Sequence, residues 1–110
     1  MKEIKAVIRP SKLDPVLEAL QRIKNLPGCI VSHVHGYGRS ADRDTGSHLE
    51  PADFAKLEIV VDERLVKKVL AAVLENAHTG SPGDGKIFVI ECADAVGIRT
   101  GKSGVERRTI

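Results

Sequence analysis

The sequence has few aromatic residues, with no tryptophan, one tyrosine and two phenylalanines among 110 residues. Domains that bind single-stranded nucleic acid stack bases on exposed aromatic side chains, and the segments 4–9 and 56–61 contain none. The net charge is only +2, so the strongly basic surface that is typical of nucleic-acid-binding domains is also missing. Both absences argue against a nucleic-acid partner.

Cysteine and long apolar runs are scarce as well. Cys29 and Cys92 are far apart and form no CxxC motif, so we expect two reduced thiols. No apolar run approaches the roughly 18 residues of a membrane span, and we expect no direct membrane insertion. Residues 1–3 lead straight into a strand pattern, so we expect no signal peptide and a cytoplasmic protein. A chain of 110 residues is long enough for one domain.

Hydrophobic periodicity predicts the secondary structure, because apolar residues alternate in some segments and recur at helical spacing in others. The predicted strands are 4–9, 29–38, 57–61 and 86–92, with a short further strand near 95–98, and the predicted helices are 13–23 and 65–77. The order β-α-β-β-α-β predicts a single α+β domain, residues 1–110, with a ferredoxin-like sandwich of two helices on a four-stranded sheet.

The ends of the helices carry their own signals. Asp14 before Pro15 is typical of a helix start, and Asp62 predicts the N-cap of the second helix. Gly80 predicts a C-terminal stop. Periodicity is lost over residues 40–53, which predicts a mobile polar loop, and a loop of this length in a compact domain is usually functional or disordered.

The fourth predicted strand is apolar on both faces, because residues 87–90 read Ile-Phe-Val-Ile. A sheet that is covered on one face only should show alternation instead. We therefore expect the second face to be buried against other copies of the same chain.

A glycine-rich segment precedes this strand. Residues 79–86 read Thr-Gly-Ser-Pro-Gly-Asp-Gly-Lys, which cannot continue a helix but can turn successive N–H groups toward an anion, with Lys86 as a point charge. The spacing is close to that of a Walker A loop, yet Ile87 replaces the magnesium-binding Ser or Thr, and the loop follows a helix instead of a strand. The segment is either a phosphate cradle of another kind or a tight turn with a solvated lysine.

Four motifs in this order resemble those of the P-II signal-transduction family. They are Ile-Arg-Pro-x-Lys-Leu-Asp-x-Val at 8–16, Gly-Tyr-Gly-Arg at 36–39, the glycine-rich loop with its strand at 79–88, and Ile-Arg-Thr-Gly at 98–101. The resemblance covers nearly the whole chain. It implies a homotrimer, a flexible T-loop at about 39–55, a B-loop at 79–86, and a C-terminal loop and tail at 97–110.

In this family ATP or ADP binds in clefts between subunits, and the T-loop grips a transporter or an enzyme. Carried over to this chain, the resemblance implies a regulator and not an enzyme, with no catalytic residues and no fixed metal site. Phosphates would be held by Gly83, Asp84, Gly85, Lys86, Arg39 and, from the adjacent subunit, Arg99. The glycine hinge Gly36, Tyr37 and Gly38 would border the nucleotide, and Val7, Ile30 and Val60 would lie near the adenine. Simple core packing for the last three, and a solvated surface position for Arg99, remain open.

The chain also departs from the family. Gly97 stands where a second C-loop arginine is usual, which leaves the preference among ATP, ADP and AMP open. Ser40 replaces the glutamine that binds magnesium with 2-oxoglutarate, and no lysine precedes Lys56 in the short T-loop. The loop has no tyrosine for uridylylation. We therefore expect an outlying member without 2-oxoglutarate sensing, in which either another small anion, such as bicarbonate, or a metal ion accompanies the nucleotide.

The histidines allow a second function. His33 and His35 are two apart on a strand and share a face, as a metal site or as solvated side chains. The residues Asp42, Asp44, His48, Glu50 and Asp53 offer further ligands in the loop, where solvation is the simpler interpretation. His78 is placed to cap a helix or to touch a nucleotide. The alternative function is a CutA-like trimeric metal-binding protein of the same architecture.

Overall fold

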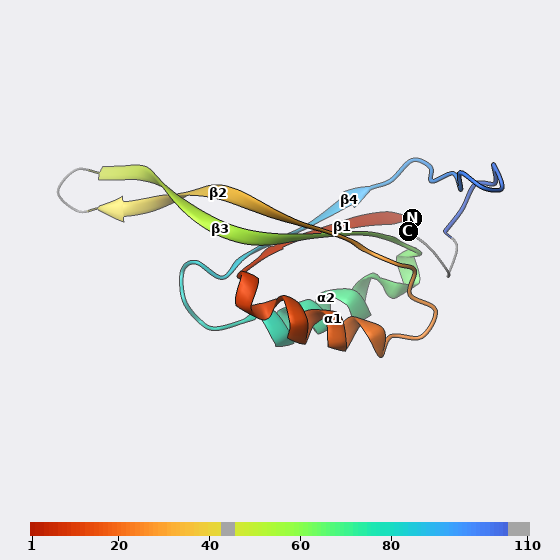
Figure 1. The fold of residues 1–110 in the computed structure, drawn as a ribbon, viewed down its shortest axis with the longest axis horizontal. Coiled ribbons are helices and arrows are strands. Elements are labelled where there is room, and N and C mark those ends of the chain that lie inside the picture. The colour runs from red at the N-terminus through yellow and green to blue at the C-terminus, as the bar shows by residue number, and fades with distance from the viewer. Residues whose placement is uncertain (43–45, 106–110) are drawn as a thin grey trace.

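The computed structural model describes residues 1–42 and 46–105 and consists of a four-stranded antiparallel sheet with two helices on one face (Figure 1). In chain order the elements are β1 Lys2–Ile8, η1 Pro10–Lys12, α1 Leu13–Gln21, β2 Ile30–Asp42, β3 Gly46–Val61, η2 Glu63–Leu65, α2 Val66–Ala77 and β4 Gly85–Glu91. The strand order is β2-β3-β1-β4. This is the predicted ferredoxin-like fold, which is confirmed.

The hydrophobic core lies between the sheet and the helices, because alternate residues of the two central strands point toward α1 and α2. The buried residues on β1 are Ile4, Ala6 and Ile8, and those on β3 are Ala55, Leu57, Ile59 and Val61. The helices contribute Val16, Leu20, Val69, Val73 and Ala77. Strict alternation on both strands shows that the residues of 1–42 and 46–105 cover only one face of the sheet.

The other face, here called the open face, carries the remaining residues of each strand. Lys5 on β1 is paired with Phe88 on β4, and Glu3 is paired with Ile90. Phe88 is 45% exposed and Ile90 is 40% exposed. The apolar fourth strand is thus an edge strand whose side chains, apart from the partly buried Ile87, are largely uncovered by the described residues.

The helix starts differ from the prediction in one case. A 3-10 turn begins at Pro10, the N-cap of α1 is Lys12, and Asp14 lies inside the first turn, so the Asp14 cap was wrong. Asp62 does cap, since its Oδ1 accepts from the Arg64 N–H at 3.2 Å, although it caps η2 ahead of α2. Helix α2 ends with His78 as C-cap. The C′ residue is therefore Thr79, and Gly80, with φ +89°, lies one position beyond the C′ position that was predicted for it.

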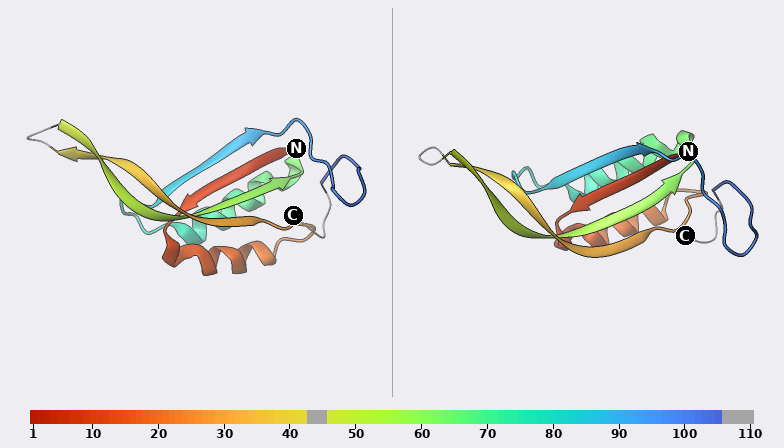
Figure 2. Two further views of the ribbon diagram at one scale, coloured as in Figure 1. Left: turned by 45° about the horizontal axis from the view of Figure 1, so that its top comes forward. Right: turned by 90° about the horizontal axis from the view of Figure 1, so that it is seen from above.

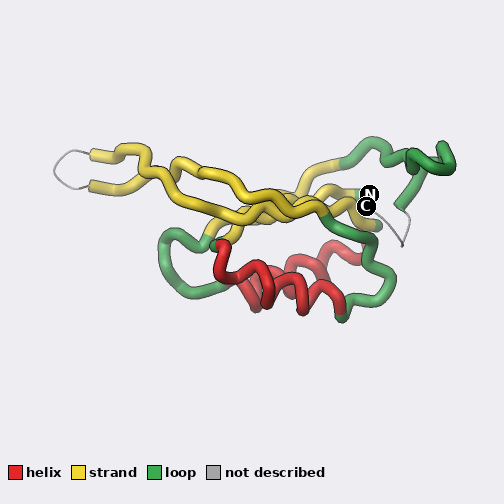
Figure 3. The backbone as a smooth tube through the Cα atoms, viewed as in Figure 1, coloured by secondary structure: helices red, strands yellow, loops and turns green. Residues whose placement is uncertain are grey.

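The region predicted as a loop over 40–53 is mostly a two-stranded ribbon. Strand β2 continues to Asp42 and β3 begins at Gly46, and the ribbon extends well beyond the helices (Figures 1 and 3). The ladder pairs Gly36 with Ala52 and Arg39 with Leu49. A ribbon without a covering layer has both faces in solvent, so its sequence lacks the alternation that identifies a strand. Residues 43–45 lie outside the described chain.

The C-terminal segment forms no regular strand at 95–98. A single antiparallel bridge joins Val96 to Ser103 and closes a small loop, while residues 106–110 of the predicted tail lie outside the described chain. Cys29 and Cys92 are both free. None of the helices in 1–42 and 46–105 is long and apolar enough to cross a membrane.

Candidate functional site

The glycine-rich loop 79–86 connects α2 to β4 at the end of the sheet from which the β2–β3 ribbon departs (Figures 1 and 2). Its position follows from strand register. Ile8, the last residue of β1, is paired with Gly85, and Val7 is paired with Lys86. The loop therefore closes over the end of β1, and Lys86 lies beside Val7 on the open face.

One carboxylate organises this loop from within. The Oδ2 atom of Asp84 accepts the N–H groups of Thr79 at 2.8 Å and Gly80 at 2.9 Å, and Oδ1 accepts the Thr79 hydroxyl. The Asp84 N–H in turn donates to the Ser81 carbonyl at 3.2 Å. These donors, led by Thr79, hold the pKa of the Asp84 carboxyl well below its usual range. Asp84 is thus ionised, and its carboxylate serves the loop itself.

Arg9 is a member of this network that was not among the predicted site residues. Its Nε donates to Asp84 Oδ1 at 3.0 Å, across 75 positions of sequence. A Cβ on Gly83 would lie 3.1 Å from Arg9 Nη2, so the guanidinium rests against the bare backbone of that glycine. The sequence signal was Arg9 directly after the strand that pairs with the loop, but its partner could be found only from the register.

Lys86 is placed differently from Arg9. It is exposed, and it forms no ion pair with any residue of 1–42 and 46–105. The one carboxylate of its own loop, Asp84, is already bound by Arg9 and Thr79. The loop therefore presents an ammonium group whose charge is not neutralised by a neighbouring acid.

The predicted glycine hinge, residues 36–39, lies on β2 where the ribbon begins. The ring of Phe54 on β3 covers Gly36, since a Cβ there would be 2.7 Å from Phe54 Cε2. An aromatic ring over a strand glycine covers backbone that would otherwise be bare, which stabilises the ribbon. Tyr37, on the opposite face, is 65% exposed. The hinge and loop 79–86 both lie at this end of the sheet (Figure 2).

Three predicted site residues, Ile30, Val60 and Arg99, do not lie with the hinge 36–39 and loop 79–86. Val60 is paired with Glu3 at the start of β1, whereas Val7 lies near the end of that strand. Ile30 begins β2 and is paired with Glu58. The segment that carries Arg99 lies beyond the opposite end of the sheet from loop 79–86 (Figure 1). Val60 and the segment that carries Arg99 therefore lie away from loop 79–86, whereas Ile30 lies between the two ends of the sheet, because its partner Glu58 is paired with Lys5 in the middle of β1.

Comparison with known proteins identifies the fold family. Residues 1–102 match the model of the family described as "Nitrogen regulatory protein P-II". A nitrogen regulatory protein P-II of Bradyrhizobium diazoefficiens is 43% identical, over 96% of this chain and 98% of its own length. One from Azospirillum brasilense is 40% identical, over 94% of this chain and 96% of its own length. The chain belongs to the P-II family.

In this P-II chain the loop and the hinge of the predicted site lie at the same end of the sheet, on its two edge strands β4 and β2. Nitrogen regulatory protein P-II 1 of Methanothermobacter thermautotrophicus is 40% identical over 94% of both chains. Membership confirms the resemblance inferred from the four motifs. It also favours a P-II regulator over the CutA-like alternative.

Two of the four histidines of the P-II chain, His35 and His48, each lie beside an acid. His35 Nδ1 is 2.7 Å from Asp53 Oδ1, across the β2–β3 ladder, and His48 Nε2 is 3.0 Å from Glu50 Oε1. Within the residues that the structure describes, no three His, Cys, Asp or Glu side chains are grouped closely enough to hold a metal ion. Asp44, another ligand considered for a loop site, lies outside those residues.

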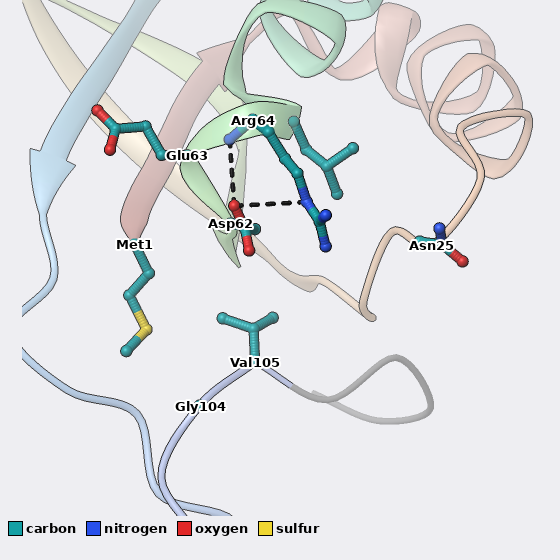
Figure 4. Close-up of a pocket in the computed structure, with 8 residues that line it drawn as sticks. Met1, Asn25, Asp62, Glu63, Arg64, Gly104 and Val105 are labelled. Atoms are coloured by element: carbon teal, nitrogen blue, oxygen red, sulfur yellow. Dashed lines mark hydrogen bonds and ion pairs between the residues drawn. The ribbon is translucent and has the colours of Figure 1, made fainter.

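Two cavities flank the sheet ends. One of about 240 Å³ lies on the helix side of loop 79–86 and is lined mainly by Ile8, Val73, Leu74, Ala77 and Ile87, with His78 and Lys86 at its border. The other, of about 560 Å³, lies at the start of β1 (Figure 4). There Asp62 is 3.6 Å from Arg64 Nε, so these two charged groups of the second cavity already pair with each other.

Proposed function

We propose that this chain is a P-II signal-transduction regulator that binds ATP or ADP, in clefts between the subunits of a homotrimer. The observation that carries the proposal is Lys86, an exposed ammonium group beside a loop whose own carboxylate is neutralised internally. The N–H groups of residues 79–81 and 84 are bonded within the loop, so the loop offers chiefly the Gly83 N–H and one uncompensated positive charge, both of which suit a phosphate.

The separation of the site residues supports a cleft between subunits. One group contains Val7, the hinge 36–39 and the loop residues Gly83, Asp84, Gly85 and Lys86, with Arg39 toward the terminal phosphate. The other contains Val60 and the segment that carries Arg99, toward the opposite end of the sheet, and Ile30 lies between the two groups. In one chain loop 79–86 and the segment that carries Arg99 lie at opposite ends of the sheet, so they would meet at one nucleotide only between subunits. A second copy, packed through the open face, supplies the missing group.

The open face supports the same assembly. Phe88 and Ile90 leave an apolar edge in contact with solvent in one chain, and burial of apolar surface stabilises association by roughly 25 cal/mol per Å². The β2–β3 ribbon projects away from this core (Figure 3). We propose the ribbon as the contact with a client, either a membrane transporter or an enzyme.

The departures from the family pattern bear on the choice of nucleotide and on the second effector. Gly97 removes one cationic contact, so AMP joins ATP and ADP as a candidate ligand. Ser40 replaces the glutamine of the magnesium site, and magnesium would therefore be held chiefly by the nucleotide phosphates. We propose a regulator without catalytic activity and without 2-oxoglutarate sensing, in which a small anion such as bicarbonate takes that place.

The direct test is calorimetric titration of ATP and ADP into the protein and its Lys86→Ala variant. Loss of a charge-assisted contact of roughly 1.5–3 kcal/mol predicts affinity reduced by about tenfold to over a hundredfold. Lys68→Ala, which removes an exposed lysine from α2, is the matched control and should leave affinity unchanged. Equal ADP affinity in the Lys86→Ala variant and the wild type would refute the phosphate site.

Mixed trimers test the shared cleft. The Lys86→Ala and Arg99→Ala variants each lack one half of every site, so each should bind ATP weakly alone. Co-assembly creates some clefts with Lys86 from one subunit and Arg99 from its neighbour both intact. We expect tight binding to return in a fraction of the sites, and no recovery would show that both residues act within one subunit or not at all.

A further inference from the structure

The contact between Arg9 and Asp84 is fixed by the fold on both sides. Arg9 immediately follows Ile8, which is paired with Gly85, so the register of β1 and β4 places Arg9 beside Asp84. The Arg9 carbonyl accepts the Lys12 N–H at 2.9 Å, which holds the Arg9 backbone at the start of η1. Asp84 is held by Thr79 and Gly80. Both partners are positioned before any ligand binds.

The guanidinium has little freedom to leave this position. Its Nε donates to Asp84 Oδ1 at 3.0 Å, and its Nη2 would touch any Cβ on Gly83. The Arg9 side chain is 36% exposed and that of Asp84 is 22% exposed, so the pair is partly shielded from water. Partial shielding makes the interaction stronger than that of a fully solvated ion pair.

An ionised aspartate inside a phosphate-binding loop presents an electrostatic problem. Its negative charge opposes that of the phosphates and cancels the charge of Lys86, two positions away. With Arg9 included, the two cations Arg9 and Lys86 outnumber Asp84 by one, and without Arg9 the sum is zero. Charge sums within a few Å decide whether an anion is attracted or repelled.

We propose that Arg9 is a positioning residue of the nucleotide site, which neutralises Asp84 so that the loop 79–86 can use Asp84 as its internal brace and still attract phosphate. The inference rests on the proposed function, since it concerns the same loop. In this arrangement Arg9 acts through Asp84 and does not itself touch the nucleotide. The hydrogen bonds of Asp84 that hold the loop and the binding of phosphate by the same loop are then compatible only while Arg9 is present.

The experiment measures ATP and ADP affinity in the Arg9→Gln, Asp84→Asn and Arg9→Gln/Asp84→Asn variants. Arg9→Gln should weaken ATP binding by about tenfold, because Asp84 is left uncompensated beside the phosphates. The loss should be larger for ATP than for ADP, which carries less charge. The double variant removes both charges, and its ATP affinity should return to within about threefold of that of the wild type.

A matched control removes a cation elsewhere. Arg64→Gln eliminates the same charge at the opposite end of the sheet, where Arg64 pairs only with Asp62 among the described residues, and should leave affinity unchanged. Arg9→Lys keeps the charge and should bind ATP within about threefold of the wild type. An Arg9→Gln variant that behaves like Arg64→Gln would overturn the proposal.

The double variant separates this role from two others. If Arg9 contacted phosphate directly, or only held the fold together, removing the Asp84 charge would not recover binding, and either result overturns the proposal. If the Asp84→Asn substitution itself disturbs the loop, the dependence of ATP affinity on salt concentration tests the proposal instead. Arg9→Gln must then show a shallower fall of ATP affinity with salt than Arg64→Gln, and equal slopes overturn the proposal. A wild type that binds no nucleotide would refute the proposed function itself, which is a different outcome.

Discussion

Gly85 lies so close to Val7 that a Cβ on Gly85 would be 1.8 Å from the Val7 carbonyl oxygen. Gly85 also has φ +101°, a backbone conformation that side chains disfavour. Gly85→Ala should therefore lower the free energy of unfolding by roughly 2–4 kcal/mol, because strain and overlap with backbone add. Urea unfolding at a fixed subunit concentration measures the change.

Gly38→Ala is the control for this substitution. A Cβ on Gly38 would meet no atom within 4 Å, and its φ lies outside the left-handed region. Its stability should stay within about 0.5 kcal/mol of that of the wild type. An equal loss of unfolding free energy in the two variants would show that the close contact between Gly85 and Val7 is not the cause of the destabilisation.

Asp84 should make stability depend on pH only in acid. Its folded pKa is lowered by Thr79, Gly80 and Arg9, whereas the unfolded carboxyl titrates near about 3.9. The stabilisation is therefore complete above the unfolded pKa and is lost as the pH falls from there through the folded pKa. The stability difference between wild type and Asp84→Asn should be equal at pH 7 and 5 and smaller at pH 3. A gap that already closes between pH 7 and 5 would contradict a lowered pKa.

The sequence predicted the sheet and the glycine-rich loop because each has a local signal. Alternation marks β1 and β3, whose buried residues include Ile4 and Ile59, and glycine with proline marks the loop. Arg9 was missed because its contact with Asp84 spans 75 positions and appears only when β1 and β4 are in register. The ribbon was missed because residues with solvent on both faces carry no periodic pattern.

The separation of Val7 from Val60 and Arg99 likewise required the fold. The resemblance assigned Arg99 to the adjacent subunit, but only the topology shows that the segment that carries Arg99 lies at the opposite end of the sheet from loop 79–86 (Figure 1). This separation within one chain is compatible with that expectation.

The open face should control assembly. Phe88→Asp places a charge on the exposed edge strand β4, where burial in an interface would leave it without a partner, at a cost of several kcal/mol. We expect light scattering to show monomers in place of trimers at micromolar concentration. Leu74→Asp is the control, since Leu74 is 59% exposed on α2, on the other side of the molecule. A wild type that is itself monomeric, or a trimeric Phe88→Asp variant, would contradict assembly through this face.

The last prediction concerns 2-oxoglutarate. The family resemblance implies a site for this dianion made of magnesium, a glutamine at the start of the T-loop and a loop lysine that would meet its distal acid. Here Ser40 has too short a side chain to replace the glutamine, and no lysine precedes Lys56 in the T-loop. Lys56 itself is paired with Glu58 at 3.4 Å. The dianion would have to lose water without matching donors, which is unfavourable.

We therefore expect calorimetric titration of 2-oxoglutarate into the Mg-ATP-loaded protein to give no saturable heat at micromolar to low millimolar concentration. ATP titration of the same sample is the positive control, because it shows that the nucleotide sites are functional. Bicarbonate is titrated in parallel as the alternative small anion. Saturable micromolar binding of 2-oxoglutarate would contradict the prediction, because it would show that Ser40 and the short loop still support that site.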